Sequence, residues 1–316
     1  MQPIYEFNPY DMNEEMFLVT VPDYIHEWIR QKKYSEILDD YTNNLCRSKQ
    51  LYVLKSMIFL GDSEIFKLLV DISDKTILFE ENNFLLKMAV SFCGDVSGGT
   101  DIDLRSIVKC LVENNADVCV SDNYCIRIAC RNGAFDVIKL LFDHGADIHA
   151  DNEYPLKCAA YYGNHELFEF LHTNGADIYV NSGEVFRVAA QCFLKNYRIV
   201  KCLLDNGFDV NFENGYALKM AIAKRKQKTI EMLLKNGADI NFLERCDLIC
   251  AIKNGSYEII KLLVDYGCDF TILNSATLGK NESDKQKIIN LLESVGVNKE
   301  MAHSIMLAEL DAMYST

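Results

Sequence analysis

Histidine and cysteine are the residues of this chain that could support metal binding or nucleophilic catalysis. Four histidines cluster in the sequence, at His144, His149, His165 and His172, and imidazole nitrogens are common zinc ligands. Cys158 precedes His165 by seven residues, and the two form a candidate thiol and base only if a third group orients the base. The value of these candidates depends on whether the fold brings them together.

Two short motifs fall outside the patterns that bind phosphate or calcium. The stretch GDVSGG lacks the Lys-Ser/Thr ending of a phosphate-binding loop. The overlapping stretch DVSGGTDID carries three acids, but their spacing matches no EF-hand loop. We therefore expect a solvated loop here, and we expect a protein that is not an enzyme and carries no cofactor or metal.

Composition and charge limit the classes of partner. The formal net charge is −14, with 46 acidic and 32 basic residues, so the overall field repels nucleic acid. Twelve cysteines are scattered without a CxxC pair, which favours reduced thiols in the cytoplasm or nucleus. The first residues resemble no signal peptide, and no stretch approaches the ~20 apolar residues of a membrane helix. We expect neither secretion nor membrane or nucleic-acid binding.

The elements that must position these residues form an internal repeat. Small residues recur at a period of 30, and each residue that ends a helix is followed 14 positions later by an alanine. The alanines are Ala89, Ala129, Ala159, Ala189, Ala221 and Ala251, and the helix-ending residues are Asn115, Gly145, Gly175, Gly207, Gly237 and Gly267. Insertions fall only between an alanine and the next helix end. A period of this size indicates stacked repeats.

One repeat shows what each part predicts. Pro155 is expected at the start of a first helix, where its missing N–H is tolerated. Ala159 would allow close packing, and Gly163 would end this helix. The following HELFEFLHTN has apolar residues at helical spacing, and Gly175 would adopt the left-handed conformation beyond the second helix. Such a pair can bury its apolar face only against neighbouring pairs.

These residues resemble the ankyrin repeat. The segment GADIHADNEYPLKCAAYYGNHELFEFLHTNGADI (145–178) has the Pro-Leu element, the paired alanines and the Gly-Ala-Asp ending of that family. The resemblance implies an all-α solenoid of stacked helix-turn-helix units that binds proteins through a concave surface. Compared with the usual 33-residue repeat, every unit lacks three residues before its alanine, so we expect shortened hairpin fingers.

The ends of the array depart from the repeat. We predict a repeat array of about eight units over 51–297, with degenerate first and last units, and a capping helix over 298–316. Residues 1–50 are expected to form a helical cap. The alternative is that 1–50 recruit a ubiquitin ligase, which would make the chain a substrate adaptor, although the leucine pattern of an F-box is missing.

A narrower resemblance concerns the source of the chain. The uniform 30-residue period and the Asn-, Lys- and Asp-rich composition resemble ankyrin-repeat proteins of giant amoeba-infecting viruses of the mimivirus kind. This resemblance implies a host protein as the partner and the host cell as the location. We expect the protein itself to be a monomer.

A basic ladder replaces the histidines of the usual repeat. Its members are Arg127, Lys157, Arg187 and Lys219, and Arg131, Lys224 and Arg225 lie on or just after the same first helices. Two hypotheses follow from this pattern. The ladder could select an acidic segment of a partner, or its cations could pair with neighbouring finger acids such as Asp122, Asp151 and Glu153.

Aromatic and variable residues beside the ladder complete the predicted contact surface. Tyr154, Tyr161 and Tyr162 fall at finger or first-helix positions, next to the variable finger residue Glu153. Tyrosine is enriched among residues that dominate binding energy, because it offers a large area with a polar tip. We predict that Tyr161 and Tyr162 contribute most to partner binding.

Overall fold

The computed structural model describes residues 23–94, 103–191, 197–253, 257–273 and 285–297. These residues contain helices and no strand. The chain divides into two compact units, Met1–Cys158 and Ala159–Thr316, with the division inside helix α9. The predicted helix at 298–316 and most of the DVSGGTDID stretch lie outside the described residues.

The first unit consists of successive helix pairs followed by the start of α9 (Ala150–Tyr162). A short 3-10 helix, η3 (Lys75–Phe79), precedes the third pair. The helices are α1 (Asp23–Arg30), α2 (Tyr34–Asn43), α3 (Arg47–Leu60), α4 (Ser63–Ile72), α5 (Glu80–Phe92), α6 (Leu104–Glu113), α7 (Val120–Asn132) and α8 (Phe135–Asp143).

The second unit continues the same alternation after the end of α9. It also contains the short 3-10 helices η5 (Ile240–Phe242) and η6 (Phe270–Leu273). Its α-helices are α10 (His165–Thr173), α11 (Val180–Gln191), α12 (Tyr197–Asp205), α13 (Phe212–Ala223), α14 (Gln227–Lys235), α15 (Arg245–Lys253), α16 (Tyr257–Asp265) and α17 (Lys285–Ser294).

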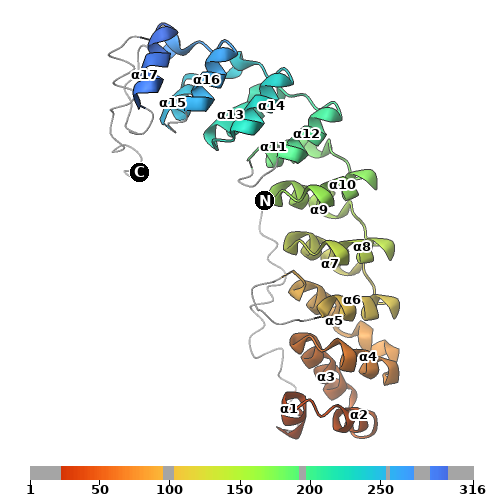
Figure 1. The fold of residues 1–316 in the computed structure, drawn as a ribbon. Helices are drawn as coiled ribbons and strands as arrows, with labels where there is room; N and C mark the ends of the chain where they lie inside the picture. Colours follow the sequence, from red (N-terminus) through yellow and green to blue (C-terminus); the bar gives the residue numbers. More distant parts are fainter. Residues whose placement is uncertain (1–22, 95–102, 192–196, 254–256, 274–284, 298–316) are drawn as a thin grey trace, which may run out of the picture. The chain divides into compact units, whose positions relative to one another are not determined.

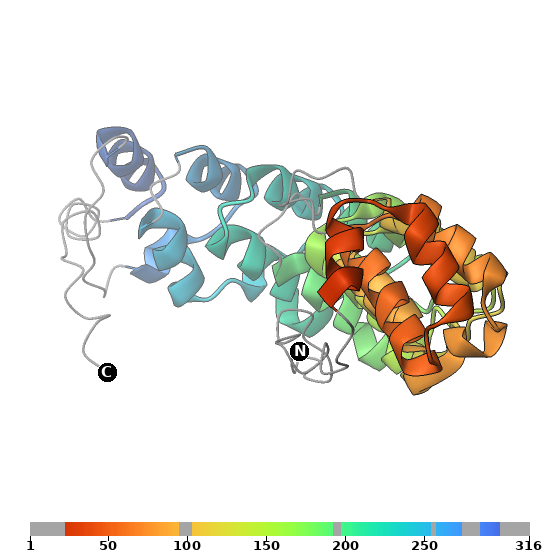
Figure 2. The same ribbon diagram turned by 90° about the horizontal axis from the view of Figure 1, so that it is seen from below.

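Within each unit the helices form two layers. First helices pack on first helices (α3 on α5 and α5 on α7; α11 on α13 and α13 on α15), and second helices pack on second helices (Figures 1 and 2). The six repeated alanines lie in the core, each at most 2% exposed. The insertions lie between α5 and α6 and between α11 and α12, at the predicted place in the repeat. This arrangement confirms the predicted stack of helix pairs.

The second helices α6, α8, α10, α12, α14 and α16 end with one hydrogen-bonding pattern. Gly145 has φ 95°, its N–H donates to the Phe142 carbonyl, and the Ala146 N–H donates to the Leu141 carbonyl. This is the Schellman arrangement, in which a left-handed residue closes the helix. Asn115 occupies the same position with φ 65°. The predicted role of the repeated glycines is therefore confirmed.

Replacing Gly145 with alanine should lower the free energy of unfolding by about 1 kcal/mol, because a Cβ disfavours positive φ. An added Cβ would meet nothing within 4 Å, so the loss would come from the backbone alone. Gly145→Asn should lose about half as much, since Asn tolerates this conformation. Urea unfolding measures both. Equal losses in the two variants would mean that the backbone conformation is not the cause.

The shortened fingers contain a left-handed turn in place of a hairpin. Three consecutive residues have positive φ at the start of five first helices, at 81–83, 121–123, 151–153, 181–183 and 213–215. A hydrogen bond closes the turn where Asn123 N–H donates to Cys119 O and Glu153 N–H to His149 O. The conformation costs roughly 1–2 kcal/mol per residue outside glycine, asparagine and aspartate. Stacking of the repeats must offset this strain.

The aspartate of the Gly-Ala-Asp ending shapes the approach to that turn. Asp147 Oδ1 accepts from His149 N at 2.9 Å, and Asp177 Oδ1 accepts from Tyr179 N at 2.8 Å. The same bond forms at Asp117, Asp209, Asp239 and Asp269. An aspartate side chain bonded two residues ahead is the usual Asx-turn. This bond explains why the acid recurs although it lies on the surface.

Neighbouring repeats are joined through the third residue of the left-handed turn. In the first unit, Asn83 Oδ1 accepts from Asp117 N at 3.0 Å, and Asn123 Oδ1 accepts from Asp147 N at 2.8 Å. In the second unit this position is Gly183, and a Cβ there would lie 2.6 Å from the Phe208 ring. The contact between neighbouring repeats at this position is therefore a hydrogen bond in the first unit and an aromatic contact at Gly183 in the second unit.

The described part of residues 1–50 packs on the array. Helix α2 packs against α4, and Tyr41, which is fully buried, shares a hydrogen bond of 2.7 Å with Ser73 Oγ. Helix α3 begins at Arg47, upstream of residue 51, where we placed the start of the repeats. Helices α1 and α2 also pack on each other, so a helix pair precedes α3 in the described part of the chain.

Candidate functional site

The predicted contact residues occupy three different environments. Arg127, Glu153, Tyr154 and Lys157 are buried, with at most 9% of each residue exposed. Half-buried positions hold Arg131, Arg187, Lys219 and Lys224, whereas Arg225, Tyr161 and Tyr162 are exposed. Four of the predicted contact residues are thus buried, so they are not exposed for contact with a partner.

Three of the four ladder cations are paired with acids of the following repeat. Arg187 Nη2 lies 2.5 Å from Glu213 Oε1, and Lys219 Nζ lies 2.9 Å from Glu244 Oε1. Arg127 Nη1 is 3.6 Å from Asp151 Oδ2. These pairs are what the second hypothesis for the ladder predicts, in which the cations join adjacent repeats.

The pairing has a consistent orientation, with the cation inside and the carboxylate outside. The Arg127 side chain is 10% exposed and that of Asp151 is 54% exposed. For Lys219 and Glu244 the values are 21% and 69%. A partner approaching the turns would therefore meet carboxylates first, with the cations beneath them.

One pair of this kind was missed from the sequence. Lys55 Nζ lies 2.7 Å from Glu81 Oε2, and their side chains are 9% and 50% exposed. Lys55 precedes Met57 by two residues, as Arg127 precedes Ala129. The signal was present, because Met57 occupies the alanine position of this degenerate first repeat, but we did not extend the ladder to it.

The Arg187–Glu213 pair predicts a pH-dependent contribution to stability. The hydrogen bond from Arg187 lowers the pKa of Glu213 below its usual value, so the contribution is present above the unfolded-state pKa and is lost as pH falls through the lowered folded-state pKa. Arg187→Ala should therefore lower the thermal midpoint at about pH 7 and make little difference near pH 3. A difference between variant and wild type that is independent of pH would contradict this prediction.

Exposed aromatic side chains mark the ends of two first helices. Tyr161 and Tyr162, which end α9, are 48% and 43% exposed, and their rings meet edge to face at 5.0 Å. Phe59 and Leu60 hold the equivalent position at the end of α3 and are also exposed. Adjacent large side chains with this exposure offer apolar area that a partner could bury.

The four clustered histidines do not converge. His149 Nδ1 contacts Glu153 Oε1 at 2.6 Å, His165 contacts Arg198, and His172 Nε2 is 3.3 Å from Asn206 Oδ1. His144 Nδ1 contacts the Leu140 carbonyl. Among the described residues, no group of three or more His, Cys, Asp or Glu side chains could hold a metal ion. No helix in this part of the chain is both long and apolar enough to span a membrane.

The cysteines divide into buried and accessible thiols. Burial raises the pKa of Cys125 to about 12 and that of Cys158, the candidate nucleophile, to about 11. Cys46 is exposed just before α3, and its pKa is lowered by the Ser48 hydroxyl and the Lys49 backbone N–H. Since the thiolate is the reactive form, the core environment of Cys158 opposes a role in catalysis.

Alkylation should follow this division. At about pH 7 iodoacetamide should modify Cys46 well before Cys125, by at least about tenfold in rate, because only Cys46 is both accessible and enriched in thiolate. Peptide mass spectrometry over a time course measures the order. Modification of Cys125 at the same rate in the folded protein would contradict the burial seen in the structure.

Comparisons with known proteins agree with this architecture. The family model described as ankyrin repeats (3 copies) matches residues 99–182 and 186–274, more than half of the chain. The crystal structure of the human ASB11 ankyrin repeat domain is similar, with a TM-score of 0.51 at 21% identity. That similarity covers 67% of this chain and 96% of the human domain. A search of curated proteins finds no match.

Proposed function

We propose that this chain, which belongs to the ankyrin-repeat family, is a non-catalytic scaffold that binds another protein through its first helices and left-handed turns. Ankyrin repeats are in general protein-interaction modules. The observation that carries the proposal is the exposed Tyr161–Tyr162 pair at the end of α9. Large aromatic side chains of this kind are enriched among residues that dominate binding energy.

The turns at the starts of the first helices support the proposal because they are fixed before a partner arrives. Asn123 links its turn to the next repeat through Asp147 N, and Arg187 links its first helix to Glu213 in the next turn. A surface held by such bonds loses little conformational entropy on binding. The exposed side chains of these turns can differ between repeats while the backbone conformation of the turn stays the same.

The same reasoning assigns roles to the remaining parts of the chain. Buried contacts of Ile37 and Tyr41 support a capping role for the described part of residues 1–50, and they favour this role over recruitment of a ubiquitin ligase. The resemblance to giant-virus proteins supports a host protein as the partner, met in the host cytoplasm or nucleus. We assign a monomeric state to the scaffold.

Combined replacement of Tyr161 and Tyr162 by alanine should weaken partner binding by at least about tenfold, since two large contact side chains are lost. The partner is first identified by affinity capture from cells that express the protein naturally, and its affinity is then measured by calorimetry. Tyr197→Ala, which removes an exposed tyrosine from the start of the second helix α12, is the matched control. An equal loss in the control, or no saturable partner, would contradict the proposed surface.

A further inference from the structure

An open cavity of about 300 Å³ lies between the N-terminal part of α3 and the start of α5, inside the first unit. The α3 residues in its wall are Arg47, Ser48, Leu51, Tyr52 and Lys55, and Glu80 and Glu81 enter from the first turn of α5. The sequence patterns indicated no site at this position. Its chemistry can be deduced from which polar groups in the wall are already engaged.

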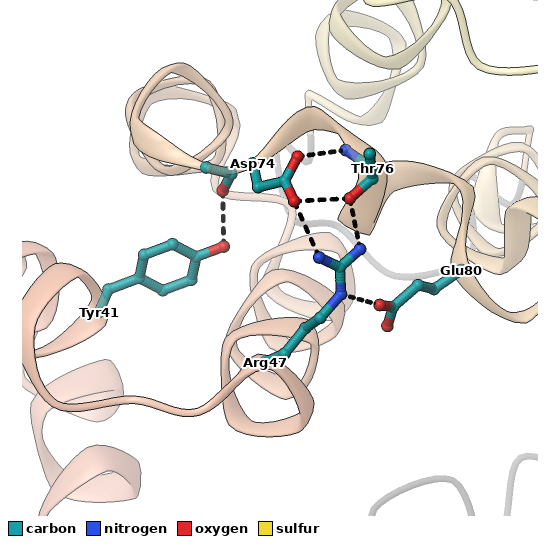
Figure 3. A network of polar contacts seen from close by, with 6 residues as sticks. Tyr41, Arg47, Asp74, Thr76 and Glu80 are labelled. Carbon is teal, nitrogen blue, oxygen red and sulfur yellow. Dashed lines mark hydrogen bonds and ion pairs between the residues drawn. The ribbon is translucent and has the colours of Figure 1, made fainter.

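Arg47 is bonded to three neighbouring side chains. Its Nη1 lies 3.0 Å from Asp74 Oδ2, its Nη2 donates to Thr76 Oγ1 at 2.6 Å, and its Nε donates to Glu80 (Figure 3). Asp74 is held in turn, because it accepts from both the N–H and the hydroxyl of Thr76. The guanidinium therefore joins two acids, whose negative charges would oppose the approach of an anion.

Lys55 is committed in the same way. Its Nζ pairs with Glu81 at 2.7 Å and lies over the Phe84 ring, 4.5 Å from the ring centroid. The Lys55 side chain is only 9% exposed, whereas that of Glu81 is 50% exposed. Together with the bonds of Arg47, these contacts pair both cations of the cavity with carboxylates, and Lys55 is also covered.

The carboxylates retain capacity to accept hydrogen bonds. Glu80 pairs through Oε1 and Glu81 through Oε2, and a carboxylate offers about four lone-pair sites on its two oxygens. Leu51 and Tyr52 are buried and supply apolar wall beside them. An aliphatic stem that ends in a cationic donor matches this combination of surfaces.

We propose, building on the protein-binding function above, that this cavity receives a lysine or arginine side chain of the protein partner. Its cationic head would bond Glu80 and Glu81 while its stem packs on Leu51 and Tyr52. The volume of about 300 Å³ lies at the lower limit of small-molecule pockets and suits one side chain. The net charge of −14 would attract a basic segment toward the surface.

The test uses the full chain and fluorescein-labelled peptides of alternating glycine with arginine or with glutamate. Fluorescence anisotropy at low salt should show binding of the arginine peptide only. Combined Glu80→Gln and Glu81→Gln should weaken this binding about tenfold. Ser48→Trp should also weaken it about tenfold, because Ser48 is an exposed residue of the cavity wall and this change keeps every charge. Thermal melting verifies that each variant is folded.

A matched control removes the same charge elsewhere. Asp136→Asn combined with Asp143→Asn neutralises two exposed acids on α8, outside the cavity, and should change binding less than about twofold. If this control weakens binding as much as the cavity variants, or if Ser48→Trp has no effect, general attraction explains the result and the proposal is overturned. A partner that depends on Tyr161 and Tyr162 but tolerates the cavity variants would overturn the cavity alone and leave the scaffold function standing.

Discussion

Burial of one helix pair against the next is the interaction on which the rest of the structure depends. Leu141 and Leu171, each followed by a left-handed residue and a buried alanine, are completely inaccessible to solvent. Fully burying a leucine contributes roughly 1.5–3 kcal/mol before entropy is subtracted. A helix pair alone has no such burial, so the left-handed turns, whose strain is roughly 1–2 kcal/mol for an unfavourable residue, persist only because neighbouring pairs hold them.

Because the repeats depend on packing against one another, ion pairs between adjacent repeats also contribute to the structure. A cation at the position of Arg127 lies under the next turn, where solvent is scarce, and an unpaired charge there would be strongly unfavourable. The acid of the following repeat satisfies it from the solvent side, as Asp151 does for Arg127 and Glu81 does for Lys55. The cations thus link repeats, and the face that they support is acidic toward the solvent.

The sequence predicted those features that a single residue type enforces. Gly145 and Ala159 lie where the period requires a helix end and a close contact, since few residues substitute for either. The left-handed turn at 151–153 was not predictable, because Asp, Asn and Glu also suit ordinary loops and the conformation comes from stacking. The burial of Arg127 was not predictable either. The spacing of the ladder cations can be read from the sequence, but which member of each ion pair is buried cannot.

The left-handed turn keeps one backbone conformation in every repeat in which it occurs, while its solvent-exposed side chains differ. This explains how repeats with the same fold can present different surfaces. At the third position of the turn, Asn123 accepts a hydrogen bond from the next repeat, whereas Gly183 leaves room for Phe208. Both residues complete the contact between repeats, so at this buried or half-buried position we expect selection for stability. The second position is exposed to solvent and carries Asn82, Asp122 or Ser182 without a change in backbone conformation. Specificity can therefore evolve at the tips, because the strain of the turn is balanced beneath them.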